Sequence, residues 1–286
     1  YKMSYKTIIS AEDLINNINN KEFIIFDCRC DIKETSYGID QYTEGHIPNA
    51  VFVDIDTDLA DKKTSTSGRH PLPDPKILTE KLCNWGMSNT KQVVIYDDAG
   101  GAFASRMWWI LRWLGHEKTA LLNGGLGAHM AAGGKLTSEI KAHENALFDI
   151  TIDDAMHVTL KEVEDAQYRM DKLIIDARSK ERYLGIKDMV DPIAGHVPGA
   201  ISYPLGNNLD KRGCFKSSEE LKLQFSKILG DIKTEGIISM CGSGITACHN
   251  ILAMEIAGIK NVRLYVGSWS EWITDKNRPI ATIDKN

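Results

Sequence analysis

Several features expected of membrane-spanning, secreted or nucleic-acid-binding proteins are missing from this sequence. No apolar run approaches the length of about 18 residues that a transmembrane helix requires. The first residues contain neither the apolar stretch of a secretory signal nor the arginine-rich, acid-poor composition of a transit peptide. The net charge is −5, so the field of the whole chain does not favour nucleic acid or an anionic membrane surface. These absences indicate a globular protein whose attraction for any anion must be local.

Cysteine is also scarce, with six residues in a chain of 286. Most lie in apolar or helical contexts and are too few for a disulfide scaffold of this size, so we expect a reducing compartment, the cytoplasm. Cys28 and Cys30 lack the two-residue spacing and the second pair of a zinc site, which favours core packing for Cys28.

Two ordered motifs occur twice in the chain. Residues 27–29 and 176–178 both read Asp-x-Arg, at an offset of 149 residues. Residues 45–50 and 195–200 both read Gly-His-x-Pro-x-Ala, at an offset of 150. Recurrence in the same order at nearly one offset indicates a duplicated domain rather than a short solenoid repeat. We therefore expect a first domain over 1–134, a polar linker over 135–157 and a second domain over 158–286.

Each half alternates apolar strands with helical segments, which predicts an α/β fold with a parallel sheet covered by helices on both faces. The expected strands are 23–27, 51–55, 93–97 and 119–122, then 173–177, 200–205, 236–240 and 262–265. The expected helices are 11–18, 75–85, 103–114 and 126–132, then 159–167, 217–229, 245–257 and 269–274. Ser217 and Glu220 have the spacing of a capping box at the start of one of them.

The stretch Cys-Gly-Ser-Gly-Ile-Thr-Ala over 241–247 contains the strongest candidate for a catalytic residue, Cys241. It joins a predicted strand to a predicted helix, so Cys241 should lie among backbone N–H groups at the positive end of a helix dipole. Such surroundings stabilise a thiolate, and the glycines let the loop curl around the sulfur. We therefore interpret Cys241 as a nucleophile. The first half has Asp97 at the corresponding place, which indicates one active site.

Other cysteine chemistries fit less well. A cysteine phosphatase needs an arginine six residues after the nucleophile, and that position is Ala247. A cysteine protease needs a histidine as general base. The available histidines are His46, His70, His196 and His249, of which His46 and His196 sit in matching, structural-looking motifs. Cys248 could resolve an oxidised Cys241, but its helical position favours core packing.

Arginines after the strand that ends at Asp176 should lie at the carboxyl edge of the sheet, where ligands bind in open α/β folds. Asp176 and Arg178 match Asp27 and Arg29, which suggests a structural ion pair in each half. Arg182 has no counterpart in the first half, so we favour it for holding an anionic group near Cys241.

The chain resembles the two-domain rhodanese-type sulfurtransferases over nearly its whole length. The resemblance is carried by the repeated motifs, the loop 241–247, Ser-Arg-Met-Trp-Trp at 105–109, Asn-Gly-Gly at 123–125 and Gly-Ser-Trp at 267–269. It implies two tandem rhodanese-like domains, each with a central parallel sheet flanked by helices, and a catalytic cysteine in the second. The loop Cys-Gly-Ser-Gly is similar to that of mercaptopyruvate-preferring members, whereas thiosulfate-preferring members carry cationic residues there.

The resemblance implies that Cys241 takes sulfur from 3-mercaptopyruvate, becomes a persulfide and passes the outer sulfur to a thiol such as thioredoxin or to cyanide, without a metal or organic cofactor. Ser243 then polarises the substrate or helps to move a proton, and Arg182 binds a carboxylate. The loop residues implied in substrate binding are Gly242, Gly244, Ile245 and Thr246. Further candidates are Lys187, His46 and His70.

One departure concerns charge. Mercaptopyruvate-preferring members often carry a second carboxylate-binding arginine before the Gly-His-x-Pro motif, but the segment 187–192 is shorter here and offers Lys187. Thiosulfate as the main donor, and a persulfide carrier that serves a partner protein, therefore remain alternatives.

Overall fold

The structure, a computed structural model, describes residues 4–283. The chain divides into two compact units. Unit 1 comprises residues up to Asp61, Pro73–Asp153 and Lys211–Phe215; unit 2 comprises Lys62–Leu72, Asp154–Asp210 and the residues from Lys216 onward. Two short segments, 62–72 and 211–215, thus pack with the unit that is not their neighbour in sequence. Among residues 4–283 no helix is long and apolar enough to span a membrane.

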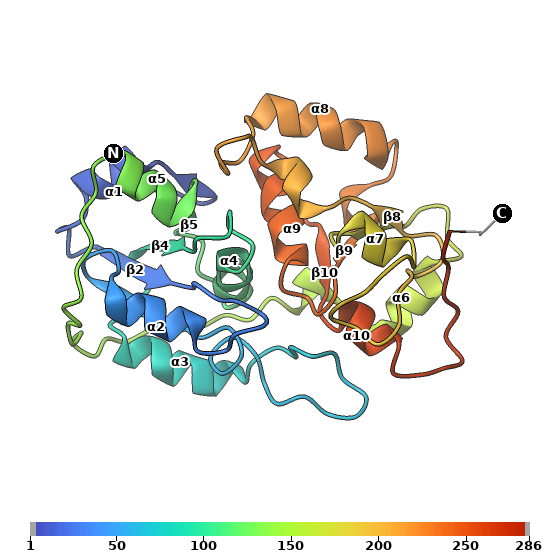
Figure 1. Cartoon of the computed structure of the whole chain (residues 1–286), viewed down its shortest axis with the longest axis horizontal. Helices are drawn as coiled ribbons and strands as arrows, with labels where there is room; N and C mark the ends of the chain where they lie inside the picture. The colour runs from blue at the N-terminus through green and yellow to red at the C-terminus, as the bar shows by residue number, and fades with distance from the viewer. Residues whose placement is uncertain (1–3, 284–286) are drawn as a thin grey trace. The chain divides into compact units, whose positions relative to one another are not determined.

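Unit 1 contains a five-stranded parallel sheet in the order β1-β5-β4-β2-β3. Its strands are β1 (Ile8–Ile9), β2 (Phe23–Asp27), β3 (Ala50–Phe52), β4 (Gln92–Tyr96) and β5 (Thr119–Leu122). Its helices are α1 (Ala11–Asn16), α2 (Tyr37–Glu44), α3 (Pro75–Asn84), α4 (Ala104–Trp113) and α5 (Gly125–Ala131). In Figure 1, α1 and α5 lie above the strands of this unit and α3 lies below them. The predicted parallel sheet with helices on both faces is confirmed.

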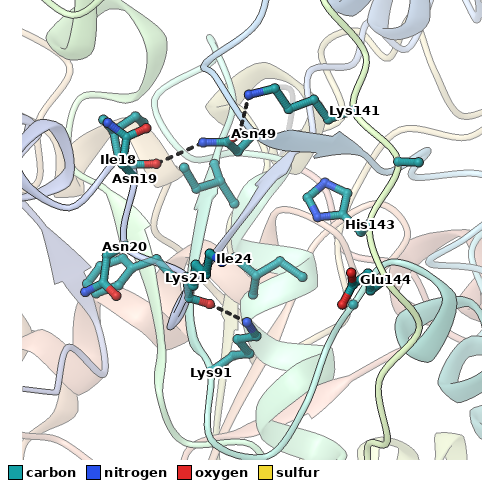
Figure 2. A pocket seen from close by; sticks show the side chains of 14 residues that line it. Ile18, Asn19, Asn20, Lys21, Ile24, Asn49, Lys91, Lys141, His143 and Glu144 are labelled. Carbon is teal, nitrogen blue, oxygen red and sulfur yellow. Dashed lines mark hydrogen bonds between the residues drawn. The ribbon is translucent and has the colours of Figure 1, made fainter.

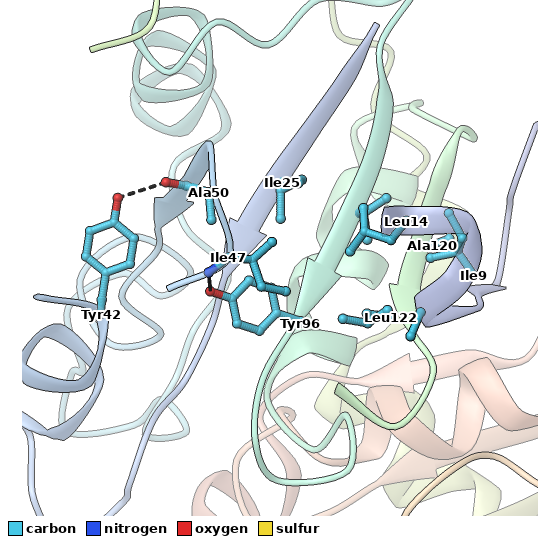
Figure 3. Packing of buried hydrophobic residues seen from close by; sticks show 11 residues of the cluster. Ile9, Leu14, Ile25, Tyr42, Ile47, Ala50, Tyr96, Ala120 and Leu122 are labelled. Carbon is cyan, nitrogen blue, oxygen red and sulfur yellow. Dashed lines mark hydrogen bonds between the residues drawn. The ribbon is translucent and has the colours of Figure 1, made fainter. Parts of the chain in front are cut away.

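The core of unit 1 follows from the alternation of side chains along its strands. Ile25 of β2 and Tyr96 of β4 face one side, where they pack with Leu14 of α1 and Ile47 (Figure 3). Phe26 faces the other side and meets Trp85, at the end of α3, with ring centroids 5.9 Å apart. Both faces of the central strands are therefore buried, as a parallel sheet requires.

Unit 2 repeats the same sheet in the order β6-β10-β9-β7-β8, again with every pairing parallel. Its strands are β6 (His157–Val158), β7 (Leu173–Asp176), β8 (Ile201–Ser202), β9 (Ile237–Met240) and β10 (Arg263–Tyr265). Its α-helices are α6 (Leu160–Ala166), α7 (Lys180–Tyr183), α8 (Ser218–Leu229), α9 (Ala247–Ile256) and α10 (Ser268–Trp272), with short 3-10 turns at Asp154–Met156, Leu205–Asn208 and Thr234–Gly236.

The local signals of unit 2 act as predicted. Ser217 Oγ accepts the N–H of Glu220, and the Glu220 carboxylate accepts the N–H of Ser217 at 3.0 Å, which completes the capping box of α8. Pairing extends the sheet only to Ser202, so the predicted strand 200–205 is shorter than expected. Helices α2 and α7 were not predicted, because both are short helices inside long loops.

The two Asp-x-Arg motifs form the same buried ion pair. Arg29 Nη2 lies 2.7 Å from Asp27 Oδ2, and Arg178 Nη2 lies 2.7 Å from Asp176 Oδ2. Each guanidinium also donates to the carbonyl of the glycine that opens the Gly-His-x-Pro motif. The predicted structural ion pairs are confirmed, and they explain why the two motifs recur together: each arginine ties its strand to its motif.

Candidate active site

Cys241 is the first residue after β9, and the loop 241–246 carries the chain into α9. Its side chain is buried, with 1% of its surface exposed. The backbone N–H of Gly244 donates to Cys241 Sγ at 3.1 Å. A sulfur that accepts a backbone N–H at the start of a helix can carry negative charge, because both groups direct positive ends of dipoles at it.

The backbone of the loop is fixed by α10. Ser268 adopts a positive φ of 53°, which aims its Oγ at the N–H of Cys241 at 3.1 Å. The N–H of Trp269 donates to the carbonyl of Cys241 at 3.0 Å, and the N–H of Ser270 donates to that of Gly242 at 2.8 Å. These three bonds hold the nucleophile loop against a second element, so the position of the sulfur does not depend on the loop alone.

The two glycines of the loop have different surroundings: Gly244 meets backbone, whereas Gly242 meets the ends of two arginine side chains. Gly244 has φ +80°, and a Cβ there would lie 2.3 Å from the carbonyl oxygen of Val266. A Cβ on Gly242 would lie 3.0 Å from Nη2 of both Arg182 and Arg69. Gly242, which directly follows Cys241, therefore leaves room for two guanidinium groups at its side.

Ser243 is paired with a histidine from the other half of the sequence. Its Oγ lies 2.7 Å from Nδ1 of His70, although the two residues are 173 positions apart. His70 belongs to the segment Lys62–Leu72, which packs with unit 2. The N–H of Arg69 donates to Ser270 Oγ at 3.0 Å and so ties this segment to α10. The pair can transfer a proton, because a hydroxyl and an imidazole lie within hydrogen-bond distance.

Two buried carboxylates hold the arginines. Arg182 donates through Nε to Asp188 at 2.9 Å and through Nη2 to Asp191 at 2.6 Å, and Arg69 donates to the second oxygen of Asp191. Burial lowers the pKa of Arg182, but the hydrogen bond to Asp188 and the nearby negative groups outweigh it, so the net shift is upward. Burial raises the pKa of Asp188, but hydrogen bonds from backbone N–H groups and from Arg182 outweigh this effect, so the net shift of its pKa is downward.

The predicted residues fall into two groups. Those of the loop and Arg182 and His70 come together around Cys241, with Ile245 buried and Thr246 half-buried. Lys187 is exposed. His46 lies in unit 1, where its ring stacks on Tyr42 at 3.9 Å and its Nδ1 lies 2.7 Å from the Tyr42 carbonyl oxygen. His46 thus packs within its own motif. Cys248 is fully buried in α9, as expected.

Unit 1 has a buried carboxyl group at the corresponding turn. The carboxylate of Asp97, directly after β4, accepts the N–H groups of Ala99, Gly101, Phe103 and Ala104 at 2.8–2.9 Å. The turn of unit 1 that corresponds to the Cys241 loop of unit 2 is therefore filled by a side chain of its own, that of Asp97.

A separate hollow of about 440 Å³ lies in unit 1 (Figure 2). Its basic lining residues are Lys21, Lys91, Lys141 and His143. Burial and the charges of Lys91 and Lys141 lower the pKa of His143. The hollow contains no cysteine, serine or threonine that could act as a nucleophile, so it is not a second centre of the chemistry considered for Cys241.

Sequence reasoning did not find Arg69, Asp188 or Asp191 as parts of the site. The one available signal was that Arg69 directly precedes His70, which was already a candidate.

Comparisons with known proteins agree with this geometry. The rhodanese-like domain family matches residues 10–132 and 159–275. A probable 3-mercaptopyruvate sulfurtransferase of Pseudomonas aeruginosa is 40% identical over 99% of this chain and 100% of its own length. A thiosulfate sulfurtransferase of Rattus norvegicus is 32% identical over 95% of this chain and 93% of its own.

Among solved structures, a 3-mercaptopyruvate sulfurtransferase from Leishmania major superposes with a TM-score of 0.83 at 29% identity, covering 95% of this chain and 75% of that one. The 3-mercaptopyruvate sulfotransferase SseA of Escherichia coli gives 0.81 at 30% identity, covering 93% and 100%. The chain therefore belongs to the rhodanese family.

Proposed function

We propose that the protein is a sulfurtransferase that moves sulfur from 3-mercaptopyruvate to a thiol acceptor or cyanide through a persulfide on Cys241. The observation that carries the proposal is the hydrogen bond of 3.1 Å from the Gly244 N–H to the Cys241 sulfur. At the corresponding turn of the first half, the backbone N–H groups are instead bound by the carboxylate of Asp97. The relative of 40% identity is named for the same donor.

In the first step the Cys241 thiolate attacks the sulfur of 3-mercaptopyruvate. A sulfur–sulfur bond forms, the carbon–sulfur bond breaks, and its electron pair leaves on carbon as the enolate of pyruvate. The proton of the donor thiol ends on that carbon, which gives pyruvate and a Cys241 persulfide anion. The backbone N–H groups of the loop stabilise the charge on the sulfurs throughout.

In the second step the acceptor attacks the outer sulfur. The acceptor is either cyanide or a thiolate such as that of thioredoxin. The sulfur–sulfur bond breaks, and its electron pair returns to Cys241 as the thiolate. The acceptor leaves as a persulfide or as thiocyanate. Because the enzyme alternates between two covalent states, the kinetics should be ping-pong.

Ser243 and His70 provide the proton transfer of the first step. Their separation of 2.7 Å lets the hydroxyl relay a proton between substrate and imidazole. Arg182 binds the carboxylate of the donor, because its guanidinium lies beside Gly242 and is held in place by Asp188. The cytoplasm suits this chemistry, since its reducing conditions keep a cysteine nucleophile available.

The test is steady-state sulfur transfer to cyanide, comparing 3-mercaptopyruvate with thiosulfate, with Cys241→Ser as the inactive control. We expect kcat/KM for 3-mercaptopyruvate to be higher by about tenfold or more, equivalent to about 1.4 kcal/mol. Mass spectrometry of the protein after donor alone should show one added sulfur atom on the Cys241 peptide, and a peptide without that addition would refute the mechanism.

Thiosulfate is the second candidate donor, because the rat relative is named for it. A preference for thiosulfate in the same assay would select it. Failure with both free donors, together with sulfur uptake from a persulfidated protein, would instead identify a carrier.

A further inference from the structure

The site described so far assigns one positive charge, that of Arg182, to the donor carboxylate. Lys187, the residue expected to add a second charge, is exposed. A second guanidinium is nevertheless present, because a Cβ on Gly242 would be equally close, at 3.0 Å, to Nη2 of Arg182 and to Nη2 of Arg69. Two arginines from distant parts of the sequence thus converge beside one residue of the nucleophile loop.

Asp191 fixes how the two guanidiniums face each other. Its side chain is 1% exposed, and its two oxygens accept one hydrogen bond from each arginine. The side chains of Arg69 and Arg182 are 25% and 21% exposed, so both can be reached from solvent. A guanidinium has five N–H donors, and the bonds to the aspartates use only some of them. Donors on both arginines therefore remain for a ligand beside Gly242.

The charges of this cluster favour a singly charged ligand. Arg69 and Arg182 are balanced by Asp188 and Asp191, so the four groups carry no net charge. A dianion placed beside the Cys241 thiolate would therefore meet oriented donors but no surplus of positive charge. A monoanionic carboxylate matches the two forks and adds less repulsion.

We infer that Arg69 is the second arginine of the donor carboxylate site, oriented by Asp191 and complementary to Arg182. This inference rests on the proposed function and adds a specificity-determining residue to it. No arginine stands directly before the second Gly-His-x-Pro motif, and on this inference the second positive charge comes from Arg69 in the segment 62–72.

The test compares two donors that differ only in the carboxylate, 3-mercaptopyruvate and mercaptoacetone. In Arg69→Met we expect KM for 3-mercaptopyruvate to rise by about 10- to 100-fold, with little change in kcat, because uniform binding is lost. The inhibition constant of pyruvate should weaken by a similar factor. Turnover of mercaptoacetone should be unchanged, because it has no carboxylate to bind. Arg69→Lys should fall between Arg69→Met and the parent, since it keeps the charge and loses the fork.

The matched control is Lys222→Met in α8, which also removes one exposed positive charge and should leave both donors unaffected. Equal losses of Arg69→Met on both donors would overturn the inference by making Arg69 a structural anchor of its segment. An unchanged KM and pyruvate inhibition would overturn it as well. A parent protein inactive with both donors would instead contradict the proposed function, so the two failures are distinguishable.

Discussion

Replacing Gly244 by alanine tests how tightly the fold holds the nucleophile. Two separate costs are expected. The residue has φ +80°, a left-handed conformation that costs an alanine about 1–2 kcal/mol. In addition, its new Cβ would lie 2.3 Å from the carbonyl oxygen of Val266, whereas carbon–oxygen contacts normally begin at about 3.3 Å. The loop or β10 must therefore shift by about 1 Å.

That shift acts directly on the chemistry, because the Gly244 N–H is the group that donates to Cys241 Sγ at 3.1 Å. A displacement of about 1 Å in a catalytic group lowers the rate by about 100-fold. We therefore expect Gly244→Ala to lose at least about 3 kcal/mol of unfolding free energy and about 100-fold in kcat/KM. Urea unfolding and sulfur transfer to cyanide would measure the two effects.

Gly258, just beyond α9, provides a matched control. It has φ +82°, but a Cβ there would meet no atom within 4 Å. Gly258→Ala should therefore show the conformational cost of about 1–2 kcal/mol alone, with full activity. If Gly244→Ala and Gly258→Ala were equally stable and equally active, the close contact with Val266 would not constrain the loop and the reasoning would be refuted.

Three further predictions concern single side chains. Asp176→Asn should destabilise the fold by up to about 3 kcal/mol, because it removes the carboxylate 2.7 Å from the buried Arg178 and leaves that guanidinium only Asp188, at 3.8 Å; Asp171→Asn, which breaks an exposed pair, should have no measurable effect in the same urea titration. Burial lowers the pKa of His196 below its ordinary 6.5. The unfolded chain then binds this proton more readily, so stability should fall as pH drops below about 6.5 and level off below the folded pKa, and His196→Gln should flatten that part of the profile. A steeper profile in the variant would contradict the sign. His70→Gln should lower kcat with 3-mercaptopyruvate by about 100-fold or more while affecting thiosulfate less, since only the former needs a proton on carbon; equal losses would mean that the contact with Ser243 is structural.

Much of the fold could be predicted from the sequence because its signals are local. Apolar strands, capping residues and the paired Asp-x-Arg motifs each act within a few positions, and the predicted ion pairs at Asp27 and Asp176 are present. The nucleophile turn could be predicted for the same reason, since strand, glycines and helix are contiguous around Cys241.

The cationic part of the site could not be predicted in the same way. Lys187 is a candidate because it lies in the segment before the second Gly-His-x-Pro motif, yet Arg69, far away along the chain, lies beside Gly242. Its segment has no apolar periodicity, and its position depends on tertiary contacts such as the hydrogen bond from its N–H to Ser270. Proximity in sequence is a poor guide where a long loop packs on a distant unit.

The placement of residues 62–72 has a consequence for how the duplicated gene could evolve. A fragment cut at the linker, beginning near 158, would keep Cys241, Ser243 and Arg182 but lose Arg69 and His70, which are encoded in the first repeat. The first repeat thus has Asp97 instead of a cysteine at this turn, yet it contains two side chains that lie beside the other repeat's nucleophile loop. Deleting it would leave a cysteine in its turn without the two side chains proposed to bind and protonate the substrate, so selection on that cysteine would extend to both halves of the chain.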